Sequence, residues 1–330
     1  MKRVLIITGA AGDAQGWGDL GVTETLRDAL LAGGYEARIE FVRSLDDFKR
    51  ALDTRTFDIV WSALYHIGAE ADIVGQNLDE AAWLADILDR RRIPYIGPSA
   101  RTMRQLIDKS WTHRILSNAD IAVPNHHEVP AGQQLPEVAF PAFVKPSCES
   151  RSVGISDASV VHDRNQLARQ VAEVHQRYRQ PALIEAYLPG PEYTVLMLAN
   201  GSGQEFLTGV VEVEACYYGK YPILRADMRG VGITRIAIPE TRVQEAAELC
   251  RQAVGALNCL DHVRVDMRVD GQGKLRIIEV NGIPGLKPGK SWSPQIYSLY
   301  HPLAEGALAE YRQLVRRIVA SSLERYGING

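Results

Sequence analysis

Two neighbouring strand patterns near the C-terminus constrain the fold of this chain more than any other feature. The first is HVRVDMRV, residues 262–269, and the second is KLRIIEVN, residues 274–281. Apolar and polar residues alternate in both, apart from a consecutive apolar pair in the second. Successive side chains of a strand point to opposite faces, so the main polar side chains of each strand share one face. The short glycine-containing segment between the two patterns predicts a β-hairpin.

This hairpin places ionisable groups opposite one another. If residues 271–274 form its loop, Asp266 lies opposite Glu279 and Arg264 lies opposite Asn281. A slip of two residues keeps all four on one face, whereas a slip of one separates the pairs. Two carboxylates and an amide oxygen with space between them suit Mg²⁺, which prefers oxygen ligands and often shares them with phosphates. The alternative is a surface ladder of salt bridges from Arg264 to the two carboxylates.

The first hundred residues alternate strand and helix patterns. VLIIT predicts a strand, and a glycine-rich loop and a helix follow it, with Gly33 and Gly34 ending the helix. FDIVWSALY and IPYIG predict further buried strands, and LDEAAWLADILDRR predicts an amphipathic helix between them. Such alternation predicts a parallel sheet covered by helices.

The remainder of the chain mixes the two element types differently. Five elements follow in order: a helix ending at Asn118, the strand PAFVKPS, a small-residue loop, the helix RNQLARQVAEVHQRYR and the strand PALIEAYLPG. From Glu192 onward the patterns are mostly strands, with a helix over TRVQEAAELCRQAVGAL and another at the C-terminus. We therefore expect three units, at 1–100, 101–190 and 191–330.

Composition argues against several classes of protein. A chain of 330 residues is long enough for two or three domains, and a net charge of -3 gives no indication of a nucleic-acid partner. The apolar run Val4–Ile7 is too short for a signal peptide or a membrane span. We expect a cytoplasmic protein with no membrane partner. The chain has four cysteines: Cys148, Cys216, Cys250 and Cys259. They form no C-x-x-C pair and have no histidine cluster nearby, which fits reduced thiols rather than a zinc site.

Two lysines upstream of the hairpin strengthen the case for a phosphate site. Lys145 ends the strand pattern FVKPS, directly before the small-residue loop, and Lys109 lies on a predicted helix. A lysine beside such a loop can follow phosphate oxygens as a point charge. Each lysine taken alone also fits a solvated surface residue. No segment matches a Walker loop or a dinucleotide-binding fingerprint.

Six motifs then occur in a recognisable order: LIDKSWTHRIL, FVKPSCESRSVGIS, LIEAYLPGPEYTV, YYGKY, VRVDMRV and IIEVNGIPGL. Together they resemble the ATP-grasp superfamily and, within it, the D-alanine–D-alanine ligases, from about Asp58 to the end of the chain. The resemblance implies a mixed α/β, ATP-grasp fold of three domains. An N-terminal parallel-sheet domain would precede two α+β lobes that clasp ATP. A homodimer is expected only from the resemblance.

The resemblance also implies a nucleotide site. Glu185 is similar to the acid that binds the adenine amino group, and Glu192 to the acid that binds the ribose hydroxyls. The residues assigned to ATP in this way are Lys109, Lys145, Ser152, Glu185, Ala186, Tyr187, Leu188 and Glu192. Two Mg²⁺ ions, with Mn²⁺ as a substitute, are expected on Asp266, Glu279 and Asn281.

Catalytic and substrate residues follow from the same resemblance. Arg264 resembles the arginine that stabilises the phosphorylated intermediate, Lys220 the lysine of a mobile loop over the γ-phosphate, and Ser291 the serine that fixes the acceptor carboxylate. The residues expected at the substrates are His66, Arg151, Gly282 and Asp19.

The chain departs from the family in three places. The early glutamate that binds the amino group of the first D-alanine has no clear counterpart, and Asp13, Gln15 and Asp19 are candidates. Arg151 replaces a small serine; it either points to solvent or adds a cation for a substrate with an additional carboxylate or phosphate. The segment GLKPGKSWSPQIYSLYHP is more basic and aromatic than is usual in the ligases, and we expect its loop from Leu286 to Pro294 to decide which amine is accepted.

The sequence thus favours an ATP- and Mg²⁺-dependent carboxylate–amine ligase. It would form an amide bond through an acyl phosphate, on an amino acid or an amino-acid-like acid, in specialised biosynthesis. The alternatives are a true D-alanine–D-alanine ligase of cell-wall synthesis, a nucleotide-binding homologue without turnover, and phosphoryl transfer to a hydroxyl group.

Overall fold

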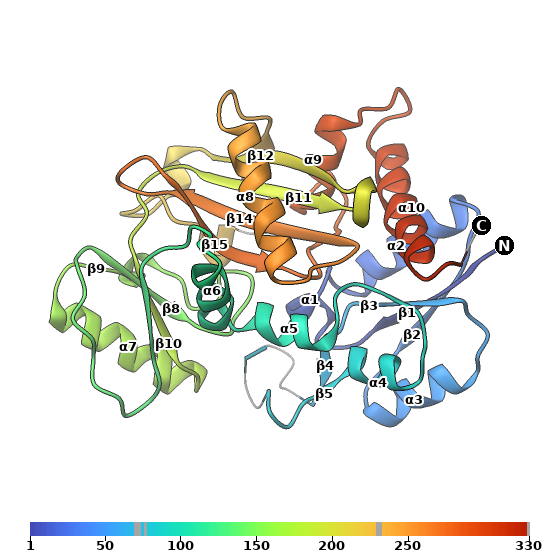
Figure 1. Cartoon of the computed structure of the whole chain (residues 1–330), viewed down its shortest axis with the longest axis horizontal. Coiled ribbons are helices and arrows are strands. Elements are labelled where there is room, and N and C mark those ends of the chain that lie inside the picture. Colours follow the sequence, from blue (N-terminus) through green and yellow to red (C-terminus); the bar gives the residue numbers. More distant parts are fainter. Residues whose placement is uncertain (69–73, 76–77, 229–232, 329–330) are drawn as a thin grey trace.

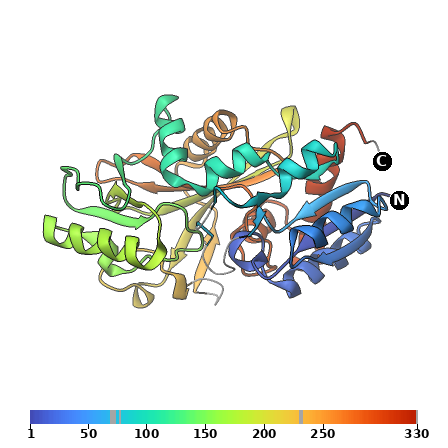
Figure 2. The same cartoon turned by 90° about the horizontal axis from the view of Figure 1, so that it is seen from below.

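The computed structural model describes residues 1–68, 74–75, 78–228 and 233–328, and its three larger sheets follow one another along the chain (Figure 1). In Figure 2, α7 (Arg164–Tyr178) lies at one end of the molecule and the N-terminal sheet lies at the other. The fold is the mixed α/β arrangement that the sequence predicts. The described part of the chain contains no helix with the length and apolar character needed to cross a membrane.

The N-terminal sheet is parallel and has the order β2-β1-β3-β6. Its strands are Arg3–Thr8 (β1), Glu36–Phe41 (β2), Ile59–Ser62 (β3) and Tyr95–Ile96 (β6). Its helices are Gly12–Gln15 (α1), Leu20–Ala32 (α2), Leu45–Asp53 (α3) and Leu84–Arg90 (α4).

Alternation along β1 explains how helices cover both faces of this sheet. Val4 and Ile6 share one hydrophobic cluster with α2, whereas Leu5 and Ile7 share another with α3 and α4. The predicted helix cap is confirmed, since α2 ends at Gly33. A two-stranded sheet of His66–Ile67 (β4) and Ala82–Trp83 (β5) lies beside this unit.

A pair of helices leads into the second sheet. The sequence predicts one helix ending at Asn118; the structure has two, Ala100–Ile107 (α5) and Lys109–Asn118 (α6). Asp108 causes the break, because its backbone is extended and its carboxylate accepts a hydrogen bond from the Trp111 N–H, at 3.1 Å. This cap fixes Lys109 as the first residue of α6.

The second sheet is antiparallel, in the order β7-β10-β8-β9, and α7 packs on it. Its strands are His126–Val129 (β7), Ala142–Pro146 (β8), Val160–Val161 (β9) and Ala182–Ala186 (β10). The short 3₁₀ helix Asp157–Ser159 (η1) precedes β9.

The third sheet is also antiparallel, in the order β13-β12-β11-β14-β15. Its strands are Glu192–Leu198 (β11), Glu205–Val213 (β12), Thr234–Ala237 (β13), His262–Val269 (β14) and Leu275–Asn281 (β15). The remaining helices are Val243–Ala256 (α8), Trp292–Tyr300 (α9), Ala307–Arg325 (α10) and the 3₁₀ turns Gly201–Gly203 (η2), Ala215–Tyr217 (η3) and Ala226–Met228 (η4).

The hairpin of β14 and β15 has the predicted register at its polar end. Arg264 lies opposite Asn281, and Asp266 lies opposite Glu279. The turn is one residue longer than predicted, because pairing resumes only at Val269 and Leu275, and a bulge at Ile278 compensates for the difference. The bulge therefore keeps the two carboxylates on the same face.

Candidate active site

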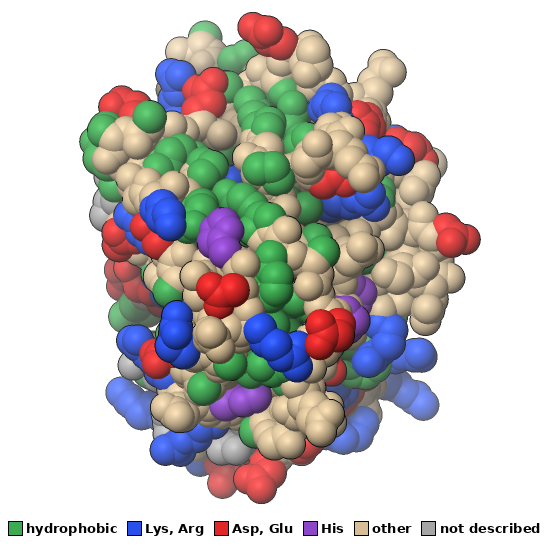
Figure 3. All heavy atoms as spheres, turned by 90° about the vertical axis from the view of Figure 1, so that its left-hand side faces the viewer, with side chains coloured by type: hydrophobic (Ala, Val, Ile, Leu, Met, Phe, Trp, Pro, Cys, Tyr) green, Lys and Arg blue, Asp and Glu red, His purple; other side chains and the backbone are tan. Residues whose placement is uncertain are grey.

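A large cavity lies between the second and third sheets. All eight residues that the sequence assigns to ATP line it, together with Asp266 and Glu279. Figure 3 views the molecule from the side of these sheets and shows hydrophobic side chains gathered in a band with charged side chains around it. The lining of the cavity combines apolar side chains with a cluster of cations and carboxylates.

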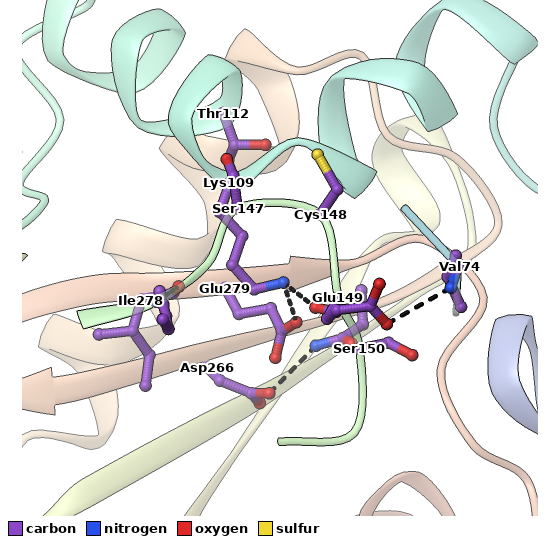
Figure 4. Close-up of polar contacts among 12 residues, drawn as sticks. Val74, Lys109, Thr112, Ser147, Cys148, Glu149, Ser150, Asp266, Ile278 and Glu279 are labelled. Atoms are coloured by element: carbon purple, nitrogen blue, oxygen red, sulfur yellow. Dashed lines mark hydrogen bonds and ion pairs between the residues drawn. The ribbon is translucent and has the colours of Figure 1, made fainter. Parts of the chain in front are cut away.

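Lys109 and Glu279 meet at the charged end of this cavity (Figure 4). The Lys109 Nζ lies 3.1 Å from a Glu279 carboxylate oxygen and donates a hydrogen bond to the carbonyl oxygen of Glu149. Burial opposes the lysine charge, but the Glu279 carboxylate outweighs burial and raises the pKa of Lys109. A buried, charged lysine at the start of α6 is suited to a phosphate group.

Lys145 and Glu185 form a second buried pair on neighbouring strands. The Lys145 Nζ lies 2.8 Å from the carboxylate of Glu185, and His113 Nε2 lies 3.0 Å from the same oxygen. Burial alone would raise the pKa of Glu185, but Lys145 and His113 lower it to about 2. Glu185 is therefore an anion that positions Lys145; its expected contact with adenine stays a prediction.

The segment after β10 offers one free backbone donor to the cavity. The N–H groups of Ala186 and Tyr187 already donate to the carbonyl oxygens of Asn125 and Pro141, at 2.9 and 3.2 Å. The next residue is Leu188. Within the described part of the chain, its N–H has no protein acceptor, unlike those of Ala186 and Tyr187. We therefore expect a nucleotide base to accept from Leu188.

The polar face of β14 and β15 holds its charges in pairs. Arg264 donates two hydrogen bonds of 2.8 Å to Asp266, and Thr194 and Asn281 donate to the same carboxylate at 2.8 and 3.0 Å. Burial acts against the Arg264 charge, but Asp266 outweighs it and raises the pKa of Arg264. A surface ladder of salt bridges is excluded, because Arg264 and Asp266 are buried.

The donor chemistry of this face fits Mg²⁺. Asp266, Glu279 and Asn281 supply oxygen donors on adjacent positions of two strands, and two of the three are carboxylates. At present Lys109 and Arg264 neutralise these carboxylates. No cluster of three or more acid, histidine or cysteine side chains suited to a metal occurs in the described residues, so a metal here would need the amide and further non-protein ligands.

A second cavity is lined by Arg264, whose ion-pair partner Asp266 lines the first cavity. Its walls come from the loop after β1, the loop after β8, the strand ends of the hairpin and the segment before α9. The predicted and candidate residues that line it are Asp13, Gln15, Asp19, Arg151, Arg264, Asn281 and Ser291. We expect the reacting substrates to bind here.

Arg151 turns toward the N-terminal loop. Its guanidinium forms an ion pair with Asp13 and donates to the Asp13 carbonyl oxygen at 3.2 Å, while Ser150 donates to the carbonyl oxygen of Ala14 at 2.7 Å. Arg151 and Ser152 both have left-handed backbones, with φ of 56° and 59°. Such strained residues persist where surrounding contacts hold them, and they occur often at ligand sites.

Of the three candidates for the missing glutamate, Gln15 has a structural role. Its side-chain oxygen accepts from the N–H groups of Tyr65 and His66, at 2.8 and 3.2 Å, and its amide nitrogen donates to the His66 carbonyl oxygen at 3.2 Å. Asp19 caps α2 by accepting from the Val22 N–H at 3.0 Å. Asp13 is paired with Arg151, as described above.

Three predicted site residues line neither of these cavities: Lys220, His66 and Gly282. Lys220 is exposed, with its ammonium over the Tyr221 ring at 5.2 Å and its backbone N–H bonded to Asp157. His66 is buried against Trp83, with ring centroids 5.2 Å apart. Their roles stay predictions. Gly282 borders a smaller cavity beside Asn281, where a Cβ would lie 2.6 Å from the Met103 sulfur.

Three further residues at the site were not predicted. His113 is four residues after Lys109 on α6, a spacing that places both on one helix face and that the sequence does reveal. Glu149 accepts from Gly75 N–H and from Gln180, at 3.2 and 2.8 Å. Arg268 lines the first cavity, between the second and third sheets, and donates to the carbonyl oxygens of Gly190 and Pro222.

The segment Leu286–Pro294 is only partly the loop that the sequence predicts. Residues from Trp292 onward form α9, and Ser291 is its N-cap residue. The Ser291 hydroxyl does not cap the helix but accepts from the Lys287 N–H at 3.0 Å. The irregular part of this wall is thus the short turn before Trp292.

Comparisons with known proteins agree with this geometry. The family model described as D-ala D-ala ligase C-terminus matches residues 117–320, more than half of the chain. A D-alanine–D-alanine ligase of Actinobacillus pleuropneumoniae is 27% identical over 92% of this chain and 95% of its own length. One of Alcanivorax borkumensis is 26% identical over 85% of this chain and 83% of its own.

A solved structure shows the same fold. The D-alanine–D-alanine ligase of Bacillus anthracis, complexed with ATP, superposes with a TM-score of 0.71 at 20% identity, over 100% of both chains. At this identity the likeness concerns the fold alone.

Proposed function

The chain belongs to the D-alanine–D-alanine ligase family. We propose that it joins a carboxylic acid to an amine in specialised biosynthesis, and that these two substrates are not both D-alanine. It is an ATP-dependent ligase that forms C–N bonds. The substrates proposed here are an amino acid or a similar acid and a second small amine.

One observation carries the ligase mechanism. We call the first cavity the nucleotide cavity and the second the substrate cavity. Asp266 lines the nucleotide cavity, Arg264 lines the substrate cavity, and the two side chains form a buried ion pair between them. A γ-phosphate held on one side of this pair would face a carboxylate held on the other. This proximity is what transfer of a phosphoryl group to a carboxylate requires.

The side chains then divide the work. Lys109 and Lys145 would hold the phosphates of ATP, and Asp266, Glu279 and Asn281 would hold Mg²⁺, which when bound neutralises phosphate charge. The substrate carboxylate attacks the γ-phosphorus, which gives an acyl phosphate and ADP. Arg264 would stabilise the charge that develops on the transferring group.

The second half of the reaction forms the amide. The amine attacks the carbonyl carbon of the acyl phosphate, phosphate leaves, and the amine proton passes to solvent or to the departing phosphate. Residues 214–228 contribute Ile223 and Leu224 to the nucleotide cavity, so this loop would exclude water from the acyl phosphate.

The loop Asp13–Asp19 supports a pair of substrates other than two D-alanines. The side-chain oxygen of Gln15 already accepts two backbone N–H groups, and Asp13 is paired with Arg151, so neither is prepared to bind a substrate ammonium. The second candidate function, a true D-alanine–D-alanine ligase, is favoured by the names of the relatives.

A substrate panel tests both functions. Phosphate release is measured with ATP, Mg²⁺ and pairs of D- and L-amino acids, and the products are identified by mass spectrometry. We expect amide formation with a pair other than two D-alanines. If D-alanine alone gives full ADP release and a dipeptide, the second candidate is right; if no pair releases phosphate, the ligase proposal is wrong.

A further inference from the structure

Two lysines lie in a fixed turn on the wall of the substrate cavity. The N–H groups of Lys290 and Ser291 both donate to the Lys287 carbonyl oxygen, at 3.2 and 2.9 Å. The Lys287 N–H in turn donates to the Ser291 hydroxyl at 3.0 Å, and Gly289 provides the left-handed backbone with φ of 68°. These bonds hold the backbone of Lys287 and Lys290 beside the same cavity, which both residues line.

The other charges of this cavity are already matched. Arg264 is paired with Asp266, and Arg151 with Asp13. Lys287 lies 3.8 Å from Asp19, whose other carboxylate oxygen caps α2.

Lys290 is the exception. Within the described residues it has no ion-pair partner, although it lines the cavity. Both lysines are exposed, so water solvates the Lys290 ammonium until a ligand brings a negative group to the turn, in addition to the carboxylate that reacts.

We propose that one substrate of this ligase is a dicarboxylate of the acidic amino-acid class, and that Lys290, with Lys287 beside it, binds the carboxylate that does not react. The inference rests on the proposed ligase function and specifies its substrate. A single unmatched ammonium fits a carboxylate better than a phosphate dianion, which collects several cations or a bidentate arginine. Two neutral amino acids would leave the positive charge of the turn unmatched.

Substrates that differ in charge but not in size give the first test. Glutamate is compared with glutamine, and aspartate with asparagine, in both enantiomers and with a panel of partner amino acids, by phosphate release with ATP and Mg²⁺. We expect kcat/KM for an acid to exceed that for its amide at least tenfold, which corresponds to about 1.4 kcal/mol. Equal values, or a preference for the amides or for D-alanine, would overturn the proposal.

Variants of the turn give the second test. Lys287→Gln combined with Lys290→Gln should raise the KM of the preferred acid about tenfold and remove the preference over its amide. The kcat and the KM for ATP should change less than about twofold, and arginine at both positions should restore the KM. Lys274→Gln is the matched control, since Lys274 is exposed in the hairpin turn, at the opposite end of β15 from Asn281 and this cavity. Equal losses for acid and amide would show that the lysines only support the turn.

A binding measurement separates the two ways of failing. Calorimetry of glutamate and glutamine with the protein, ADP and Mg²⁺ needs no turnover. Tighter binding of glutamate, lost in the double variant, supports the dicarboxylate site even if a partner substrate is missing. Indistinguishable binding contradicts that site alone, whereas absence of phosphate release with every pair contradicts the ligase function.

Discussion

Glu279 is the single side chain on which most of the site depends. It pairs with Lys109, lies opposite Asp266 and faces the nucleotide cavity. These contacts join the lysine that would hold phosphate to the carboxylates that would hold Mg²⁺.

We expect Glu279→Ala to reduce ATP turnover at least a hundredfold, the usual size of a lost charge-stabilising group. Steady-state phosphate release checks this, with Glu212→Ala as a control on the same sheet, where the acid is paired with Arg235 outside the cavities. Thermal unfolding of both variants verifies that they fold. Turnover retained in folded Glu279→Ala would remove this residue from the metal site.

Gln15 shows where sequence reasoning at the residue scale reaches its limit. Its position after the first strand made it a candidate for the substrate, but its amide makes three hydrogen bonds to the backbone of Tyr65 and His66. Nothing in local sequence reveals this, since the partners are about fifty residues away. By contrast, the positions of Asp266 and Glu279 follow from alternation within one hairpin.

Gln15→Glu should lower the free energy of unfolding by about 2 kcal/mol, because a carboxylate oxygen would face the carbonyl oxygen of His66 where an amide donates now. Urea unfolding measures the loss. The same variant should not gain turnover of D-alanine. A gain of that activity at unchanged stability would instead make position 15 a substrate contact.

Among the elements, the β14–β15 hairpin was predicted with its register at the site, and its bulge was not. Alternation fixes which residues share a face, and the bulge lies at the consecutive apolar pair Ile277 and Ile278, where the alternation is interrupted. At Ile278 the bulge also serves the site, since this side chain lines the nucleotide cavity and its carbonyl oxygen lies 3.4 Å from the Lys145 Nζ. The break between α5 and α6 was missed for a similar reason, because a single capping residue, Asp108, interrupts a continuous helical pattern.

Arg268 connects the loop 214–228 to the third sheet. It is buried, and it donates to Gly190 at 2.9 Å and to Pro222 within the loop. We expect Arg268→Met to raise the KM for ATP about tenfold through the loss of these charge-assisted bonds. Arg276→Met is the control, because Arg276 lies opposite Arg268 but pairs with Asp270 instead.

Protease sensitivity gives the loop test a second measurement. Limited trypsin digestion should cut Arg268→Met faster within 214–228 than wild type, both without nucleotide and with a non-hydrolysable ATP analogue. Identical KM and identical cleavage in the two arginine variants would show that the loop is held by other contacts.

Across the whole molecule, the sequence predicts three consecutive units, and each of the three larger sheets lies within one of the predicted ranges; the boundaries themselves stay predictions. The C-terminal helix α10 packs against α2 and β6 of the N-terminal unit. This packing was not predicted, because a helical pattern does not indicate which element the helix packs against. Asp261 joins these distant parts, accepting from the Gly97 N–H at 2.6 Å, from Asn200 at 2.8 Å and from Arg325 at 2.8 Å.

Global stability should depend on pH through two buried histidines. Burial lowers the pKa of His66 and of His262 from 6.5 to about 4. Between these values the unfolded chain binds more protons than the folded one, so stability falls as the pH drops below about 6.5. We expect a loss of about 2 kcal/mol for each histidine between pH 8 and pH 5.

Urea unfolding from pH 8 to pH 5 measures this dependence. The double variant His66→Phe and His262→Phe should show a flatter profile, whereas His127→Phe, at an exposed ring, should keep the wild-type slope. A double variant with the slope of the wild type would assign the pH dependence to other groups.

The acyl phosphate is the central claim of this account, and oxygen transfer tests it most directly. The preferred acid is labelled with ¹⁸O in its reacting carboxylate, and the phosphate released with ATP and the amine is analysed by mass spectrometry. We predict one ¹⁸O atom in each phosphate released per amide formed, since the carboxylate oxygen that attacks the γ-phosphorus leaves with it. Amide formation with unlabelled phosphate would contradict the mechanism.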